Sequence, residues 1–311
     1  MVSLRAMHMD MDGSRDGTTS LSPEEIATTV ANPFFGRPMQ PPTLRVVPTD
    51  MAMDMVMAGA MYGLSDRVTL LAMANYIDLE MDHLTFAGGM GTEVLGEFTT
   101  KSSGFGDSVL GALVGLDDGF EAGRQLNLLV GVKVPTGSNT QTDTVLTPMG
   151  TEPEPRLPYP MQLGTGTWDA RVGLTGFGHR GDVGLGGQIL GDLPVADNGE
   201  GYRPGARVEA SAWAAWEARP GVSVSARVRG ASQGRIQNRD PAIVAPVQTA
   251  DPDSQGGDTV EAFLGVNLLG RRGALRGHRL GVEVGLPLLR DLNGPQLETD
   301  WAATVGWQKA F

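Results

Sequence analysis

The sequence predicts an all-β fold: a transmembrane antiparallel up-and-down β-barrel of about twelve strands, forming one domain over residues 1–311. Three observations predict it. Segments of about ten residues alternate between apolar and polar positions, the connections between them alternate between long and short, and the last segment ends on an aromatic residue, Phe311. A barrel of this kind has long extracellular loops and short periplasmic turns.

The composition excludes several classes of protein. No apolar run approaches the roughly 20 residues that a membrane-spanning helix needs, so a helical membrane protein is excluded. The net charge of -12, from 36 acidic and 24 basic residues, argues against nucleic acid as a partner. The chain has no Cys, which rules out disulfide bonds and thiolate metal sites and is compatible with an oxidising compartment.

The alternation is clearest at Val222–Arg229, where Val and Ala share one face and Ser and Arg share the other. The same period of two recurs in further segments: Leu126–Val134, Trp168–Leu174, Val208–Ala218, Val260–Leu268, Leu280–Leu288 and Trp301–Phe311. A soluble β-sandwich would produce similar segments, so the connections have to distinguish the two folds.

The connections alternate strictly in length, as they do in bacterial barrels. Strands are expected at Val2–Met11 and Arg45–Tyr62, and the pattern continues to the end of the chain. The long connections are Asp12–Leu44, Ala87–Leu95, Ser138–Met161, Asp197–Arg203, Gln237–Gly257 and Asn293–Gln296. The short turns are Gly63–Asp66, Asp117–Arg124, His179–Asp182, Arg219–Gly221 and Gly270–His278. We therefore expect both termini on the periplasmic side.

The two ends of the chain predict where the protein resides. The last segment places Trp301, Trp307 and Phe311 on one face, and a terminal Phe after alternating apolar positions resembles the assembly signal of outer-membrane barrels, although Lys309 departs from it. The expected partners are outer-membrane lipid and the barrel assembly machinery. Met1 leads directly into alternating residues, so we expect an integral outer-membrane protein whose signal peptide is absent from this chain.

Charged residues indicate which face of each strand turns toward the lumen. Hydrocarbon penalises charge and a lumen tolerates it, so the face with Trp301 and Phe311 is expected to meet lipid. The residues expected to carry charge in the lumen are Lys133, Asp169, Arg171, Glu209, Glu217, Arg227, Arg229, Glu261, Arg279 and Glu283. They either pair across neighbouring strands and brace the interior, or form a selectivity filter.

Methionine occurs at every second position in parts of the first two strands and recurs in the third, which puts each row on one face. In the first strand Val2 and Leu4 share the lipid side, and Val68 and Leu70 do so in the third, so the methionines point inward. The expected inner wall consists of Met7, Met9, Met11, Met51, Met53, Met55, Met57, Met73 and Met81, with His83 beside them. A β-bulge would reverse this parity.

Two interpretations of the methionine rows follow from their chemistry. Thioethers are soft ligands that suit Cu(I), so copper is the candidate metal. Alternatively, Met is a flexible apolar side chain that fills irregular gaps, and the rows would then pack against a plug or the inner wall. The spacing is compatible with both.

Catalysis is not expected. The chain has four histidines, His8, His83, His179 and His278, and the last two lie in expected periplasmic turns. A lipid-hydrolysing barrel would need one of them beside a Ser on the lipid face near a rim, and the sequence assigns that placement to none of them, although such triads assemble in space.

Three short segments, Gly104–Asp107, Gly131–Ser138 and Leu163–Asp169, resemble a known family. Their pattern is similar to that of the MetA-pathway phenol-degradation family of outer-membrane transporters. The resemblance implies a transmembrane barrel with a transport function, and it carries no catalytic residues. The methionine-rich first strands resemble, more loosely, barrel proteins associated with copper handling.

The leading hypothesis is thus an outer-membrane channel or transporter for a small solute, with a link to copper handling. The solute or metal ion would pass between ion pairs on one side of the lumen and methionines on the other. Two alternatives stay open, namely a metal-binding barrel that does not conduct and a barrel enzyme.

Overall fold

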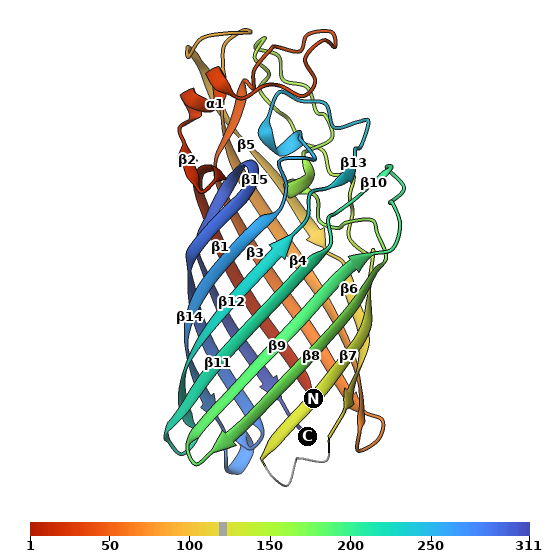
Figure 1. Cartoon of the computed structure of the whole chain (residues 1–311), viewed down its shortest axis with the longest axis vertical. Coiled ribbons are helices and arrows are strands. Elements are labelled where there is room, and N and C mark those ends of the chain that lie inside the picture. The colour runs from red at the N-terminus through yellow and green to blue at the C-terminus, as the bar shows by residue number, and fades with distance from the viewer. Residues whose placement is uncertain (118–122) are drawn as a thin grey trace.

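Eleven strands close a ring in the described part of the chain, residues 1–117 and 123–311 (Figure 1). In this computed structural model the ring strands are β1 (Val2–Gly17), β3 (Val46–Gly63), β4 (Val68–Phe86), β6 (Ser108–Gly115), β7 (Arg124–Val134), β8 (Asp169–Arg180), β9 (Val183–Pro194), β11 (Arg207–Arg219), β12 (Val222–Gln233), β14 (Gly257–Leu269) and β15 (His278–Lys309). Strand β1 pairs with β15 and so closes the barrel. Outside the ring, β2 (Thr19–Leu21) pairs with β1 and β5 (Val94–Phe105) pairs with β4.

Twelve strand segments make up the barrel wall, because one of the eleven ring strands, β15, contributes two antiparallel segments. Residues 279–292 of β15 pair with β14, and residues 296–309 pair with β1. The reversal lies at Gly294, whose positive φ of 78° fits a tight turn. The last expected connection, Asn293–Gln296, is therefore a turn inside one strand element, and the expectation of about twelve strands is confirmed.

Strands β5 and β6 together occupy one strand position beside β4. β5 pairs with residues 76–86 of β4, and β6 pairs with residues 68–73. Only β6 continues the ladder to β7. The chain thus leaves the regular ladder at Gly106 and Asp107, between the two strands.

Long loops and short turns lie at opposite ends of the barrel (Figure 1), which confirms the alternation expected from the sequence. The loop end carries α1 (Pro23–Thr29), η1 (Tyr159–Met161), β10 (Tyr202–Arg203), β13 (Gln237–Asn238) and η2 (Gln248–Ala250), whereas η3 (Gly273–Leu275) lies in a turn at the end that holds both termini. The expected turn Asp117–Arg124 falls mostly on residues 118–122, outside the described residues. Among the helices of the described residues, none is long and apolar enough to span a membrane.

The outer face of the barrel is a belt of exposed apolar side chains. On β9, for example, the side chains of Val183, Leu185, Ile189 and Leu193 are between 44% and 60% exposed. So large an apolar surface would be unfavourable in water but is stable against hydrocarbon. This face is therefore the lipid-facing surface of a transmembrane barrel.

The sequence also encodes a short helix, α1, that period-two alternation does not reveal. The Ser22 hydroxyl accepts a hydrogen bond from the Glu25 amide at 3.2 Å, and the Glu25 carboxylate accepts one from the Ser22 amide at 2.8 Å. This capping box, with Pro23 in the first turn, starts the helix. The spacing Ser-x-x-Glu is visible in the sequence and is the pattern that could have predicted it.

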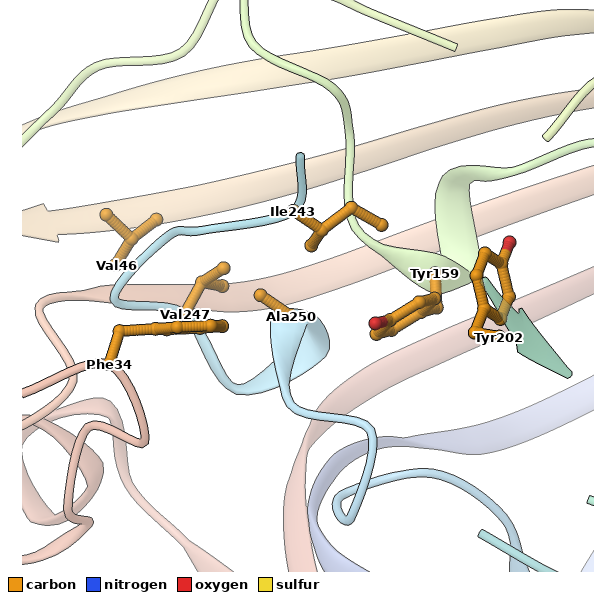
Figure 2. Packing of buried hydrophobic residues seen from close by; sticks show 7 residues of the cluster. All are labelled: Phe34, Val46, Tyr159, Tyr202, Ile243, Val247 and Ala250. Carbon is orange, nitrogen blue, oxygen red and sulfur yellow. The ribbon is translucent and has the colours of Figure 1, made fainter. Parts of the chain in front are cut away.

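The extracellular loops share one apolar cluster, which we call the loop core: Phe34, Val46, Tyr159, Tyr202, Ile243, Val247 and Ala250 (Figure 2). The rings of Tyr159 and Tyr202, from different loops, meet with centroids 5.0 Å apart. Arg156 ties the same loops together through ion pairs with Glu200 at 2.5 Å and Asp240 at 2.6 Å. The loops consequently pack on one another at the extracellular end of the barrel.

Candidate functional site

A cavity of about 660 Å³, here called the central cavity, lies inside the barrel next to the loop core. One side, the methionine wall, consists of Met9, Met11, Met51, Met53 and Met81 and is continued by Ile77, Leu79 and Leu163. The other side, the charged wall, consists of Lys133, Arg207, Arg229, Glu261, Arg290 and Glu298. Small-molecule pockets in proteins measure about 300–1,000 Å³, so the central cavity has the size of a ligand site.

Strand register assembles the methionine wall. Met51 pairs with Met11 on one side and with Met81 on the other, and Met53 pairs with Met9 in the next row. Directly paired residues have Cβ atoms about 4.5–5.5 Å apart, so flexible thioether side chains on three strands come within reach of one another. The register shift in β3, between Pro48 and Asp50, lies above these rows and leaves their inward parity unchanged.

The upper part of this wall is covered by the connection between β7 and β8. Met51 and Met81 are buried in one cluster with Leu157, Met161 and Leu163 of that connection. Met161 is fully buried and adds a further thioether to the cluster. The sequence did not predict Met161 as part of this wall, because Met161 lies in a Pro-rich loop without an alternating pattern of apolar and polar residues.

The structure does not bring the other expected wall residues to the central cavity. Met7 pairs with Met55 on the same inner face, and Met57 lies opposite Arg5, nearer the periplasmic end. Met73 sits between Gly59 and Val109. His83 is buried and stacks on the ring of Phe98, with centroids 4.6 Å apart, away from the cavity lining. In residues 1–117 and 123–311 no group of three His, Cys, Asp or Glu side chains could hold a metal ion.

Most of the expected lumen charges meet an opposite charge, which lies on an adjacent strand for Lys133, Arg171 and Arg229. The partner of Arg227 lies on β15, across the intervening β14. Lys133 contacts Asp169, the residue directly opposite in the register. Arg229 Nε donates to Glu261 Oε2 at 2.8 Å, and Arg227 Nε donates to Glu283 Oε1 at 3.0 Å. Arg171 Nε donates to Asp192 Oδ1 at 2.6 Å, and Glu209 lies 3.4 Å from Arg207 of the same strand and 3.9 Å from Arg229 of the next strand. The pairs between strands brace the barrel wall, and all of the pairs leave little net charge at these positions.

The remaining two expected lumen charges lie near the periplasmic end. Glu217 accepts hydrogen bonds from the Gly221 amide at 2.8 Å and from Arg271 at 3.3 Å, so it belongs to a turn. Arg279 donates Nε and Nη2 to Asn267 Oδ1 at 3.0 and 2.6 Å.

Sequence reasoning also missed a triad at the extracellular side of the central cavity. The Glu298 carboxylate accepts from Arg15 Nε at 2.5 Å and lies 3.0 Å from Arg290 Nε. Arg290 and Glu298 flank the turn inside β15, which was expected to be a loop. Extending the alternation of Leu280–Leu288 by two residues would have placed Arg290 on the outer face. A register shift at Leu288, which has no partner on β14, reverses the parity and turns Arg290 inward.

The three segments that resemble the transporter family meet at one point, which we call the Asp107 junction. Asp107 Oδ1 accepts from the Gly137 amide at 3.1 Å, and Asp107 Oδ2 accepts from the Thr165 amide at 2.9 Å and the Thr165 hydroxyl at 2.7 Å. The Thr136 hydroxyl donates to the Gly106 carbonyl at 2.8 Å. The junction fixes both ends of the β7–β8 connection to the break between β5 and β6.

Close backbone contact explains the glycines of these segments. A Cβ on Gly137 would lie 2.8 Å from Gly164 Cα, and a Cβ on Gly164 would lie 2.5 Å from the Gly137 carbonyl oxygen. Only glycine fits at such distances. The motif thus has a structural role, which is to hold the loop that covers the methionine wall.

Comparisons with known proteins identify the fold. No family model matches the chain, and no curated protein sequence matches it. An outer membrane channel from Pseudomonas putida is similar, with a TM-score of 0.61 and 15% identity over 100% of this chain and 94% of that one. The transport unit of the autotransporter AIDA-I from Escherichia coli has a TM-score of 0.54 and 11% identity, over 100% of this chain and 90% of that one.

A deletion mutant of the TodX monoaromatic hydrocarbon channel is also similar, with a TM-score of 0.50 and 10% identity over 100% of this chain and 89% of that one. These solved structures are channel and autotransporter barrels. At such low identities the likeness concerns architecture alone. The chain has the fold of the transmembrane β-barrels of the bacterial outer membrane.

Proposed function

We propose that this protein is an outer-membrane channel for small, mainly apolar solutes, which pass through the central cavity. The observation that carries the proposal is the lining of that cavity, where thioether and aliphatic side chains form one continuous wall. An apolar solute is stabilised by such a surface without the loss of a hydrogen bond. The architecture, shared with channel barrels, agrees with this function, and so does the resemblance of the Asp107 junction segments to the MetA-pathway transporter family.

The test is solute uptake into vesicles whose outer leaflet contains lipopolysaccharide, with radiolabelled toluene as the probe. Met53→Arg would place a long charged side chain in the central cavity and is expected to reduce uptake to the rate of protein-free vesicles. The matched control is Met149→Arg, because Met149 is 71% exposed and lies in an extracellular loop. Gel mobility with and without heating checks that both variants form barrels. Equal uptake by Met53→Arg and the unmodified protein would overturn the proposal.

We propose, as a second function, that the methionine wall binds a soft monovalent metal ion such as Cu(I). The specific observation is the direct pairing of Met51 with both Met11 and Met81, together with the buried Met161. Thioether sulfur suits Cu(I) and does not suit hard divalent cations. The ion would then be cargo or a sequestered ligand of a barrel that does not conduct.

Titration with Cu(I) against a competing chelator under anaerobic conditions tests the metal proposal. Leu has nearly the volume of Met, so a Met11→Leu, Met51→Leu, Met81→Leu variant should fold. Its affinity for Cu(I) is expected to fall at least about tenfold. The control replaces Met7, Met55 and Met57, which share the inner face but do not line the central cavity. Equal affinity of the two triple variants would remove the proposal, and single-channel recording with copper separates transport from sequestration.

We also propose that the barrel assembly machinery recognises the last strand and Phe311. Trp301 and Trp307 lie on the same outer face of β15 as the apolar side chains of the lipid belt. Phe311 is 93% exposed and follows the end of β15, so it is available to a partner. This supports an outer-membrane location with lipid around the belt.

A further inference from the structure

A second cavity, here called the lower cavity, lies at the periplasmic end of the lumen and measures about 330 Å³. Its polar lining includes Arg5, Arg227, Asn267, Arg279, Glu283 and Thr304. On β12, Arg227 of the lower cavity lies two residues from Arg229 of the charged wall, a rise of about 6.6 Å along the strand. A solute that leaves the central cavity toward the periplasm therefore reaches the lower cavity next.

Charge is distributed differently in the two cavities. Along the lumen, cations are paired with carboxylates in Lys133–Asp169, Arg171–Asp192, Arg207–Glu209, Arg227–Glu283, Arg229–Glu261 and Arg290–Glu298. Arg5 and Arg279 have no carboxylate partner among the described residues, and the side chain of Arg279 donates only to the neutral amide oxygen of Asn267. The lower cavity thus carries an excess of positive charge in a protein whose net charge is -12.

Arg5 and Arg279 reach the lower cavity from β1 and from the first half of β15. Arg5 lies opposite Gly306, and a Cβ on Gly306 would be 3.4 Å from Arg5 Cγ, so the arginine side chain lies against the glycine. Gly306 belongs to the second half of β15, and Arg279 belongs to the first half. The hydroxyl-bearing Thr304 lines the same cavity.

We propose that Arg5 and Arg279 form an anion subsite that receives the carboxylate of a small organic anion. Two guanidinium groups that face one cavity repel each other, and an anion between them removes the repulsion. The planar guanidinium matches carboxylate oxygens through two parallel hydrogen bonds, which a neutral solute cannot accept in the same way. The subsite rests on the proposed channel function and narrows its solute to an apolar body with an acidic group.

Calorimetric titration of the purified protein in a neutral detergent at low salt tests the subsite. The probes are benzoate and its neutral counterpart benzyl alcohol, which share an aromatic ring. Benzoate is expected to bind more tightly than benzyl alcohol, and Arg5→Gln with Arg279→Gln should weaken benzoate at least about tenfold while leaving benzyl alcohol unchanged. Arg219→Gln is the control, because Arg219 lies at the same end of the barrel but does not line the lower cavity.

The outcomes separate this subsite from the proposed function. If benzyl alcohol binds and benzoate is no tighter, or if the double variant binds benzoate as well as the unmodified protein does, the anion subsite is wrong and the apolar channel stands. If neither probe binds to a barrel that shows the heat-dependent gel shift, both proposals fail. Stronger binding of inorganic phosphate than of benzoate would overturn the assignment to carboxylates.

Discussion

The carboxylate of Asp107 accepts two hydrogen bonds from Thr165, one from its amide at 2.9 Å and one from its hydroxyl at 2.7 Å. Asp107 lies in the barrel wall, and Thr165 lies 58 residues later, where the β7–β8 connection returns to the wall. Above this point the Ser102 hydroxyl donates to the Met161 carbonyl at 2.7 Å. These contacts hold the connection, and with it Met161 and Leu163, over the methionine wall.

Replacing Asp107 with Asn should loosen the β7–β8 connection. An amide offers one acceptor oxygen where the carboxylate offers two, so donors from Gly137 or Thr165 lose a partner. The expected cost is about 1–3 kcal/mol of unfolding free energy, measured by urea denaturation in lipid. Proteolysis within residues 135–168 should also become faster.

Asp143→Asn is the control for that substitution, because Asp143 accepts from the Lys101 amide at 2.7 Å on an exposed part of the same connection. Water replaces a lost partner there, so the effect should be under about 1 kcal/mol. Equal effects of the two substitutions would show that the junction does not anchor the loop.

Arg45 should be needed for the extracellular loops. Its side chain is fully buried and donates to the carbonyl oxygens of Ala27, Ala87, Gly88, Met90 and Gly91. Burial lowers the pKa of Arg45 from its usual value. Arg45→Met would leave these carbonyl groups unpaired and is expected to cost about 3 kcal/mol, with faster proteolysis of residues 18–45 and 87–93.

The matched substitution Arg37→Met removes an exposed arginine of the same loop, whose guanidinium lies 5.5 Å from the ring centroid of Phe34. It should change proteolysis little. If Arg45→Met left the loops as resistant as Arg37→Met does, the carbonyl contacts would have no part in holding them.

The loop core should weaken in alkali because of Tyr202. Burial raises the pKa of Tyr202 to about 12, whereas an unfolded tyrosine titrates near 10. Stability from this group is therefore complete below about pH 10 and is lost as the pH rises toward 12, since only a released loop gives up the proton in that range. Tyrosinate absorbance should show a late-titrating group that Tyr202→Phe removes. If Tyr202→Phe instead removed a tyrosine that titrates early, the result would contradict the burial of Tyr202.

Removing the ring of Phe311 should impair assembly but not the stability of the assembled barrel. The side chain is 93% exposed, so Phe311→Ala removes little packing. Assembly in cells, measured as the fraction of heat-modifiable protein in the outer membrane, is expected to fall several-fold. The control Phe35→Ala removes a ring of 66% exposure from an extracellular loop and should have no such effect. Loss of thermal stability in the purified Phe311→Ala barrel would point to packing rather than recognition.

Two features of the sequence by itself determined the fold and the faces of its strands. Loop lengths that alternate between long and short distinguish a barrel from a sandwich, and period two places Met11, Met51 and Met81 on the inner face. Both are local properties, because a side chain's face depends on its parity along its own strand. The sequence also contained the Ser22 and Glu25 capping box, which needs no distant contact.

Only the tertiary structure decided which inward residues meet. The register of the strands places Met51 between Met11 and Met81. The β7–β8 connection, which has no alternating pattern, folds so that Met161 joins them. The tertiary structure also stacks the ring of His83 on that of Phe98 and leaves Arg5 without a carboxylate partner among the described residues. These relationships depend on contacts between residues far apart in the chain, whose geometry is fixed only when the barrel closes and the loops pack into it.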